Sequence, residues 1–244
     1  MSRLQDKTAV VTGGGSGIGL GAAQRFVEEG AFVYLFGRRQ DVLDAAVTQL
    51  GPNARAVRGS VTDQADLDRL YETVKAERGG LDILFANAGT GTFAPLGEIT
   101  PQHYDQIFDV NVKGLIFTVQ KGLPLMEAGG SIILTGSTTG EMGTPQFSIY
   151  SATKAAVRNL ARSWAQDLRG TGIRVNVLSP GPTRTDLALN VVGEAAFEVL
   201  GASTPIGRLG EPAETGAVAA FLASSDSSFM TGGEVFVDGG LAQV

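Results

Sequence analysis

Two patterns of hydrophobic and polar positions alternate along the chain. Short apolar runs, typical of buried parallel strands, are followed by longer segments with apolar residues at helical spacing. The expected strands are residues 8–11, 31–36, 54–57, 81–86, a run ending at 132–134, 173–178 and 234–237. The expected helices follow the first glycines through Val27 and then cover 41–50, 66–75, about 100–126, 150–168 and 212–222. This alternation predicts an α/β fold: a doubly wound, Rossmann-like parallel sheet with helices on both faces, forming a single domain over residues 1–244.

Composition narrows the class of protein. The chain is 43% hydrophobic and carries a net charge of −6, which disfavours nucleic acid or an anionic membrane as a partner. It has no cysteine and one histidine, so neither disulfides nor a thiolate or histidine metal site is expected. The amino terminus lacks the apolar core of a signal peptide, and no apolar run is long enough to span a bilayer. We therefore expect a soluble cytoplasmic protein without a metal.

A glycine-rich segment lies between the first strand and the first helix. Its spacing is G-x-x-x-G-x-G, where glycines allow a tight turn and let a pyrophosphate approach the backbone at a helix N-terminus. A glycine-rich turn without a ligand is the alternative, but this position between strand and helix favours dinucleotide binding. The residues predicted to contact the cofactor here are Gly13, Gly15, Ser16, Gly17, Ile18 and Gly19.

The end of the second strand indicates which dinucleotide is bound. A carboxylate at this point would bind the ribose 2′-hydroxyl of NAD, but the chain has Gly37-Arg38-Arg39. Arginine side chains suit a 2′-phosphate, whereas a carboxylate would repel one. Solvated surface arginines are the alternative. We predict that Arg38 and Arg39 bind NADP(H).

Candidate catalytic groups occur in the middle of the chain. Tyr150 and Lys154 are at i and i+4 and share one face of a helix. The lysine charge should lower the phenol pKa from its ordinary value of about 10, towards the range useful for proton transfer. Ser137 follows a buried strand, at the edge where open α/β sheets bind ligands.

Together these motifs resemble the short-chain dehydrogenase/reductase family, and the resemblance covers nearly the whole chain. The motifs that carry it are the glycine-rich loop, Asn87-Ala88-Gly89, Asn111, Ser137, Tyr150-x-x-x-Lys154, Pro180-Gly181 and the terminal Val237-Asp238-Gly239-Gly240. Each motif is modest alone, but their order and spacing are specific.

The resemblance implies a role for each matched position. Tyr150 would exchange a proton with the substrate oxygen, Lys154 would lower the tyrosine pKa and hold the nicotinamide ribose, Ser137 would bond the substrate oxygen, and Asn111 would anchor a water in the proton relay. The further cofactor contacts that it implies are Asn87, Ala88, Gly89, Tyr150, Lys154, Pro180, Gly181, Thr183 and Thr185. Ser60 occupies a position where the family often has an adenine-binding aspartate, so Ser60 is not assigned.

Other residues have two interpretations. Phe93, Met142, Phe147 and residues 187–192 are expected in loops at the carboxyl edge of the sheet, where they would line an apolar substrate pocket or simply cover core. His103 is expected to be a surface or packing residue. Arginines at 158, 162 and 169 could attract an acidic carrier protein, although a solvated or interface role is favoured.

The predicted function is hydride transfer between NADP(H) and an apolar ketone or secondary alcohol. The alternatives are a 3-oxoacyl thioester (acyl-carrier-protein) reductase and a non-catalytic NADP(H)-sensing protein of the same fold. The resemblance also implies a homotetramer.

Overall fold

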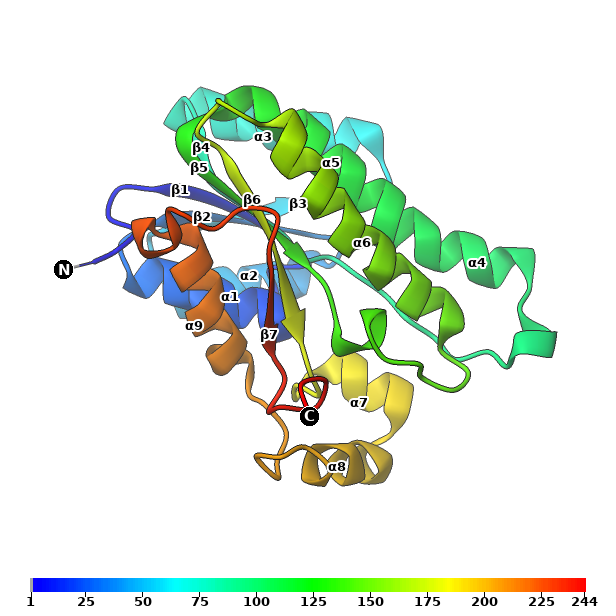
Figure 1. The fold of residues 1–244 in the computed structure, drawn as a ribbon. Helices are drawn as coiled ribbons and strands as arrows, with labels where there is room; N and C mark the ends of the chain where they lie inside the picture. The colour runs from blue at the N-terminus through cyan, green and yellow to red at the C-terminus, as the bar shows by residue number, and fades with distance from the viewer. Residues whose placement is uncertain (1) are drawn as a thin grey trace.

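The computed structural model describes residues 2–244, and a seven-stranded parallel sheet is its centre (Figure 1). The strand order is β3-β2-β1-β4-β5-β6-β7. The strands are β1 (Thr8–Thr12), β2 (Phe32–Gly37), β3 (Ala54–Arg58), β4 (Leu81–Ala86), β5 (Met126–Thr135), β6 (Arg174–Pro180) and β7 (Glu234–Val237). Every expected strand is present, and the predicted doubly wound fold is confirmed.

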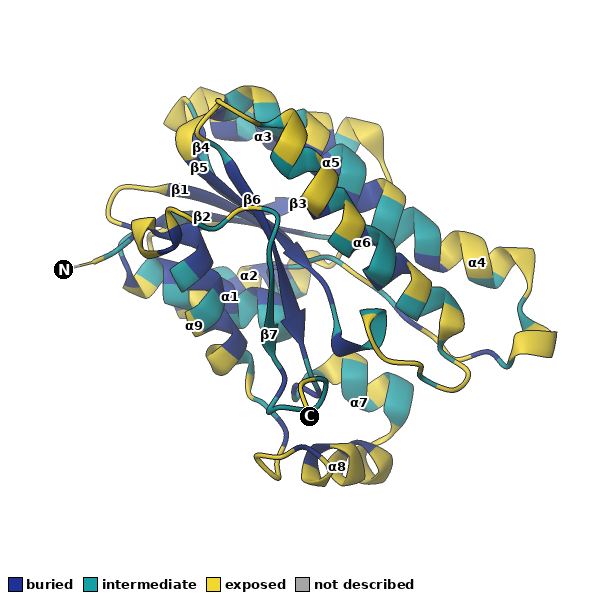
Figure 2. Cartoon of the chain, in the orientation of Figure 1, coloured by how far each residue is buried: buried dark blue, intermediate teal, exposed yellow. Residues whose placement is uncertain are grey.

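Helices cover both faces of this sheet, as Figure 1 shows. They are α1 (Gly17–Glu28), α2 (Gln40–Leu50), α3 (Gln64–Arg78), α4 (Pro101–Phe108), α5 (Leu115–Gly122), α6 (Ser148–Asp167), α7 (Asp186–Val192), α8 (Glu194–Ala202) and α9 (Pro212–Ala223). One buried cluster packs α1, α2 and α9 against the sheet, and a second packs α3, α5 and α6 against the other face. Figure 2 shows the resulting arrangement, with buried strands between helices that are exposed on their outer sides.

Two expectations about the elements were wrong. Residues 100–126 do not form one helix: a π-helical segment, η2 (Asp109–Gly114), separates α4 from α5, and a short 3₁₀ turn precedes β5, which begins at Met126. Residues 187–192 are not a loop but most of α7. Thr185 caps α7, because its hydroxyl accepts a hydrogen bond from the Ala188 amide at 3.2 Å.

The strand register decides which side chains meet at the carboxyl edge. In the β2–β3 pair, Gly37 lies beside Arg58. In the β4–β5 pair, Ala86 lies beside Leu134, so Asn87 and Ser137 follow these strands on the same edge. Cα partners in parallel strands project their side chains to the same face of the sheet. The carboxyl ends of β1, β2, β4, β5 and β6 therefore bring the motifs that follow these strands to one side of the molecule.

Candidate active site

The glycine-rich turn after β1 has a backbone conformation and a close packing that require glycine. Gly13 and Gly17 have φ of +65° and +52°, a region that strains other residues. A Cβ on Gly19 would overlap the Gly13 carbonyl oxygen and come within 2.7 Å of Nδ2 of Asn87. The turn thus requires glycine at these positions and leads into the N-terminus of α1, where backbone N–H groups favour an anion. This geometry fits the phosphates of a dinucleotide.

Thr12 joins the glycine-rich turn to the segment after β4. Its hydroxyl accepts hydrogen bonds from the amides of Asn87 and Ala88, both at 3.0 Å. The Asn87 amide group donates to the Thr12 carbonyl at 3.1 Å and its oxygen accepts from the Thr135 hydroxyl at 3.2 Å. The structure therefore places Asn87 as a connection between the ends of β1, β4 and β5, and Thr12 is a site residue that the sequence did not single out.

The tip of β2 is followed by two arginines, and the nearby Asp41 in the first turn of α2 is not ion-paired with either. Arg38 and Arg39 are exposed, and neither forms an ion pair with any of residues 2–244. Gly37 has open space around it: a Cβ there would meet only Leu43 of α2, at 3.6 Å. The arginines are placed as predicted, at the end of a strand that neighbours β1.

Ser137, Tyr150 and Lys154 come together as their motifs predict. Lys154 is buried, and its ammonium donates to the Thr135 carbonyl at 2.9 Å and lies 5.3 Å from the centre of the Tyr150 ring. Ser137 follows β5 and its hydroxyl accepts from the Thr139 amide at 3.2 Å. It also lies close enough to the phenol to influence its pKa. The i, i+4 pair on α6 therefore faces the end of β5.

The expected lowering of the Tyr150 pKa is wrong for this chain. Burial raises the pKa of Tyr150 to about 12, and the nearby Ser137 hydroxyl offsets only part of that rise. Burial also lowers the pKa of Lys154 to about 8. Lys154 is buried and Tyr150 is half-buried, and loss of water is the largest influence on the pKa of each group. The Lys154 ammonium donates its hydrogen bond to a backbone carbonyl rather than to the phenol.

Asn111 lies in the π-helical segment and is 1% exposed. Its side-chain oxygen accepts from the Thr90 amide at 2.8 Å, and its amide group donates to the Thr90 carbonyl at 2.8 Å and to the Thr153 hydroxyl at 3.2 Å. The side chain therefore fixes the loop after β4 to α6, the helix that carries Tyr150. Its role in a proton relay stays a prediction.

The segment after β6 closes the site on the side of α7. Pro180 ends the strand, and the Gly181 amide donates to the Val237 carbonyl at 3.0 Å. Thr183 bonds the Gly181 carbonyl at 3.2 Å. A Cβ on Gly17 would come within 2.9 Å of the Thr185 methyl group, so the cap of α7 touches the phosphate turn. The two segments that sequence assigns to cofactor binding are thus in direct contact.

An aromatic stack covers the Tyr150 ring. Phe147 stacks on it with ring centres 4.4 Å apart, and Phe93 lies 4.5 Å from Phe147. The Gln146 carbonyl accepts from the Ala94 amide at 2.8 Å, with Gln146 at φ +61°, and so ties the two loops together. Sequence placed these side chains in loops but did not reveal their stacking, because it depends on the geometry of two separate loops.

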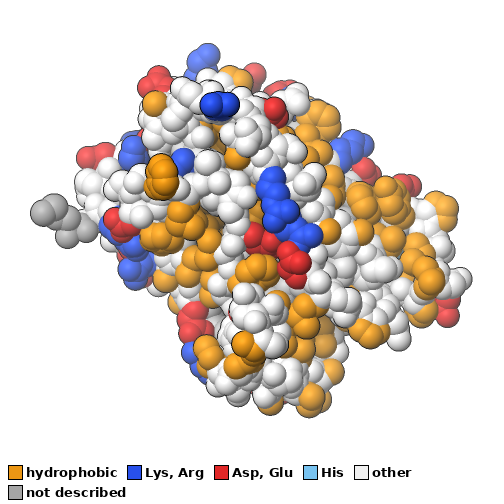
Figure 3. All heavy atoms as spheres, viewed as in Figure 1, with side chains coloured by type: hydrophobic (Ala, Val, Ile, Leu, Met, Phe, Trp, Pro, Cys, Tyr) orange, Lys and Arg blue, Asp and Glu red, His pale blue; other side chains and the backbone are white. Residues whose placement is uncertain are grey.

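The basic residues of α6 do not form a uniform positive surface. Arg158 is ion-paired with Glu141, and its Nε lies 4.0 Å from Glu234. Figure 3 shows basic and acidic side chains side by side near the middle of this face. His103 is an early residue of α4, and its amide bonds the Thr100 hydroxyl that caps the helix.

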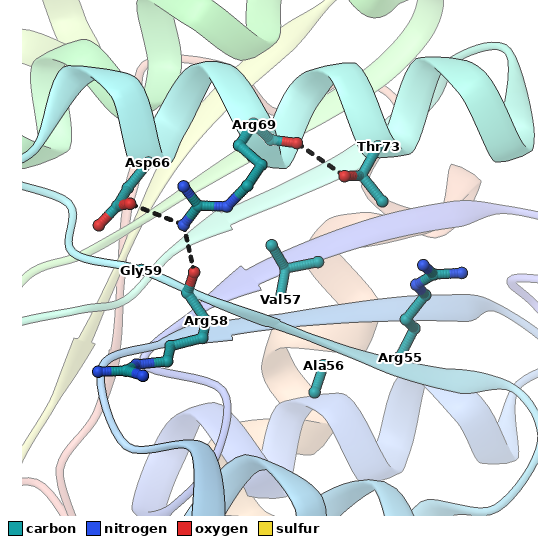
Figure 4. Close-up of a pocket in the computed structure, with 8 residues that line it drawn as sticks. All are labelled: Arg55, Ala56, Val57, Arg58, Gly59, Asp66, Arg69 and Thr73. Atoms are coloured by element: carbon teal, nitrogen blue, oxygen red, sulfur yellow. Dashed lines mark hydrogen bonds and ion pairs between the residues drawn. The ribbon is translucent and has the colours of Figure 1, made fainter.

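A hollow of about 540 Å³ lies between β3 and α3, and none of Ser137, Tyr150 and Lys154 lines it (Figure 4). Two of its arginines are already paired: Arg55 with Glu77, and Arg69 with Asp66 at 2.6 Å. Arg69 also donates to the Arg58 carbonyl at 2.6 Å. Among residues 2–244, His, Asp and Glu side chains form no cluster able to hold a metal. No helix in the same range is long and apolar enough to cross a membrane.

Comparison with known proteins shows which proteins the whole chain resembles. A family model described as enoyl-(acyl carrier protein) reductase matches residues 13–242. The chain is 62% identical to the oxidoreductase asL5 of Sarocladium schorii over 100% of this chain and 99% of that protein. It is 36% identical to the NADP-dependent (R)-specific alcohol dehydrogenase of Lentilactobacillus kefiri, over 98% and 97% of the two chains.

Solved structures of similar proteins align with nearly the whole chain. A short chain dehydrogenase/reductase family protein aligns with a TM-score of 0.89 and 36% identity over 99% of this chain and 100% of the other. The 3-ketoacyl-(acyl-carrier-protein) reductase from Brucella melitensis, complexed with NADH, aligns with a TM-score of 0.91 and 32% identity over 98% and 99%. The chain is an oxidoreductase that belongs to the short-chain dehydrogenase/reductase family, which uses nicotinamide cofactors.

Proposed function

We propose that this oxidoreductase transfers hydride between NADP(H) and an apolar ketone or secondary alcohol. The observation that carries the proposal is the convergence of Ser137, Tyr150 and Lys154 beside a glycine-lined turn, with arginines instead of an acid at the tip of β2. A nicotinamide cofactor supplies the hydride. The resemblance between the L. kefiri enzyme and this chain supports the choice of NADP(H) and of an alcohol or ketone.

Each catalytic side chain would act on the substrate oxygen or on its proton. The Ser137 hydroxyl would donate a hydrogen bond to a carbonyl oxygen, and Tyr150 would deliver a proton to that oxygen as it gains charge. At neutral pH the phenol carries the proton that an acid must donate, although burial raises its pKa and so makes it a weaker acid than an exposed tyrosine. Lys154 would hold the cofactor ribose, and Asn111 would keep the loop after β4 in position.

The substrate side of the site supports an apolar ligand. Phe93 and Met142 are 39% and 38% exposed, and Leu187 on α7 is 50% exposed. Large apolar side chains left exposed around a polar centre commonly mark a ligand site. The proposed homotetramer and cytoplasmic location stay predictions.

A 3-oxoacyl thioester reductase is the second candidate. The description of the family model and the Brucella structure favour it, since both name acyl-carrier-protein reductases. An acidic chain argues against recognition of an acidic carrier, because like charges repel. A non-catalytic NADP(H) sensor would not need Ser137, Tyr150 and Lys154 together.

The test is a spectrophotometric screen of the purified protein. NADPH and NADH are each offered with aryl and alkyl ketones, aldehydes and a 3-oxoacyl thioester, and kcat/KM is measured for every pair. We expect turnover of an apolar ketone with NADPH preferred over NADH. Preference for the thioester would select the second candidate, and cofactor binding without turnover of any substrate would favour the sensor.

A further inference from the structure

Arg58 stands next to the tip of β2, although it is 21 residues away from Gly37 in sequence. It is the last residue of β3, and the parallel register makes it the direct neighbour of Gly37. The Gly59 amide donates to the Gly37 carbonyl at 2.8 Å, which fixes this pairing at the end of both strands. The position of Arg58 is therefore set by the sheet and not by a free loop.

The side chain of Arg58 projects to the face of the sheet that α2 covers. A Cβ on its neighbour Gly37 would point at Leu43 of α2, and paired positions in parallel strands share a face. Ala54 and Ala56, at the alternate positions of β3, pack in the cluster that contains α1 and α2, whereas Val57 belongs to the opposite cluster. Figure 4 agrees, because the Arg58 side chain extends away from Arg69 and Val57.

Arg58 also differs from the other arginines near the end of β3 in its contacts. Arg55 is paired with Glu77 and Arg69 with Asp66. The guanidinium of Arg58 is exposed and forms no ion pair within residues 2–244, and only the backbone carbonyl of this residue is bonded by Arg69. The Asp66 carboxylate is held by Arg69 and by the Ser60 amide at 2.8 Å. The Ser60 amide lowers the pKa of Asp66 most, and Arg58 adds a smaller effect from a distance. A cation without an ion pair thus lies beside Gly37.

We propose that Arg58 is a third ligand of the 2′-phosphate of NADP(H), from the strand next to β2, the strand that Arg38 and Arg39 follow. The inference rests on the proposed use of NADP(H). Three guanidinium groups, two from the turn after β2 and one from the end of β3, would surround an anion above Gly37, where the absence of a side chain leaves space. Charge-assisted hydrogen bonds between arginine and phosphate are strong and directional.

The test compares Arg58→Gln with Arg55→Gln. Both variants remove one exposed arginine from β3 and change the net charge equally, but Arg55 lies on the opposite face. Isothermal titration calorimetry gives Kd for adenosine 2′,5′-bisphosphate and for adenosine 5′-monophosphate, which differ only in the 2′-phosphate. We expect Arg58→Gln to weaken the bisphosphate at least ~10-fold and to leave the monophosphate within ~2-fold. Arg55→Gln should change neither by more than ~2-fold.

The possible outcomes separate the role of Arg58 from the proposed use of NADP(H). A wild type that binds both nucleotides equally overturns the proposed NADP(H) preference and Arg58 with it. A wild type that prefers the bisphosphate, with Arg58→Gln unchanged, overturns the role of Arg58 alone. If Arg58→Gln loses the same affinity for both nucleotides, Arg58 contacts the adenosine or the 5′-phosphate instead. If Arg55→Gln loses as much bisphosphate affinity as Arg58→Gln, the effect is one of general charge. Both results contradict the proposal. Circular dichroism confirms that the variants are folded.

Discussion

At the scale of single residues, the site is governed by burial. Tyr150 and Lys154 share a helical face, but desolvation raises the phenol pKa to about 12 and lowers the lysine pKa to about 8. Both shifts favour the neutral form of the group, as expected when charge is removed from water. The sequence shows which groups meet at i and i+4, but not how much water remains around them. For this reason it predicted the partners correctly and the direction of the tyrosine shift wrongly.

Removing the Tyr150 hydroxyl should abolish most catalysis without loss of cofactor binding. Tyr150→Phe keeps the ring that stacks on Phe147, and it removes the proton donor. General acid catalysis contributes ~10²–10⁴-fold, so kcat for the best ketone should fall by that factor, while Kd for NADPH stays within ~2-fold. Tyr104→Phe is the matched control, because Tyr104 also stacks on a phenylalanine, Phe108, but lies on α4 and is 44% exposed. A Tyr150→Phe enzyme with the turnover of the control would contradict the assignment.

At the scale of elements, the strand-to-helix turns carry the ligand site. The run Thr8–Val11 followed by glycines was enough to predict β1, the turn and α1, because an apolar strand and a glycine-rich turn are local signals. The break at Asp109–Gly114 was not predicted, because a π-helical turn has no distinct hydrophobic period. Helix α7 was also missed: it has seven residues, and its signals were Thr185 as cap and Gly193 at its end.

The close contact between Gly19 of α1 and Gly13 of the glycine-rich turn should be needed for cofactor binding. Gly19→Ala adds a methyl group that would overlap the Gly13 carbonyl and crowd Asn87, so the turn must open. We expect NADPH affinity to fall by at least ~10-fold, since losing one well-placed phosphate contact corresponds to about a decade. Gly97→Ala is the control, because a Cβ there meets nothing within 4 Å. If calorimetry gives the same Kd for both variants, the close approach at Gly19 does not shape the cofactor site.

At the scale of the whole molecule, long-range contacts that no local pattern reveals join distant parts of the chain. The pairing of Gly37 with Arg58 is one, and it becomes visible only when the strand register is known. Another is the attachment of the amino-terminal segment, where Arg3 contacts the end of α1. Its Nε donates to Glu29 at 2.7 Å, its Nη2 is ion-paired with the same carboxylate, and Leu4 packs in the core. Arg25 adds a further bond to Glu29 at 2.9 Å.

Glu29 should therefore make the stability of the whole molecule depend on pH. Hydrogen bonds with Arg3 and Arg25 lower the pKa of Glu29 from 4.5 to about 2, although burial opposes the shift. A carboxyl whose folded-state pKa is lowered stabilises the fold fully above its unfolded-state pKa and loses this contribution as the pH falls towards the folded-state value. Glu29→Gln should lower the free energy of unfolding by about 1–3 kcal/mol at pH 7. The gap from the wild type should narrow between pH 4.5 and pH 2, the window set by these two values.

Urea unfolding of both proteins at several pH values between 7 and 3 measures this difference. Glu28→Gln is the control, because Glu28 is the residue before Glu29, at the end of α1, and its side chain is 52% exposed. Its contacts are a hydrogen bond from Gln24 at 3.0 Å and a 4.0 Å approach to Arg25. The control should stay close to the wild type at every pH, since exposed contacts such as those of Glu28 with Gln24 and Arg25 contribute little. A Glu29→Gln variant whose deficit is the same at pH 3 as at pH 7 would show that the lost stability comes from packing and not from the carboxylate charge.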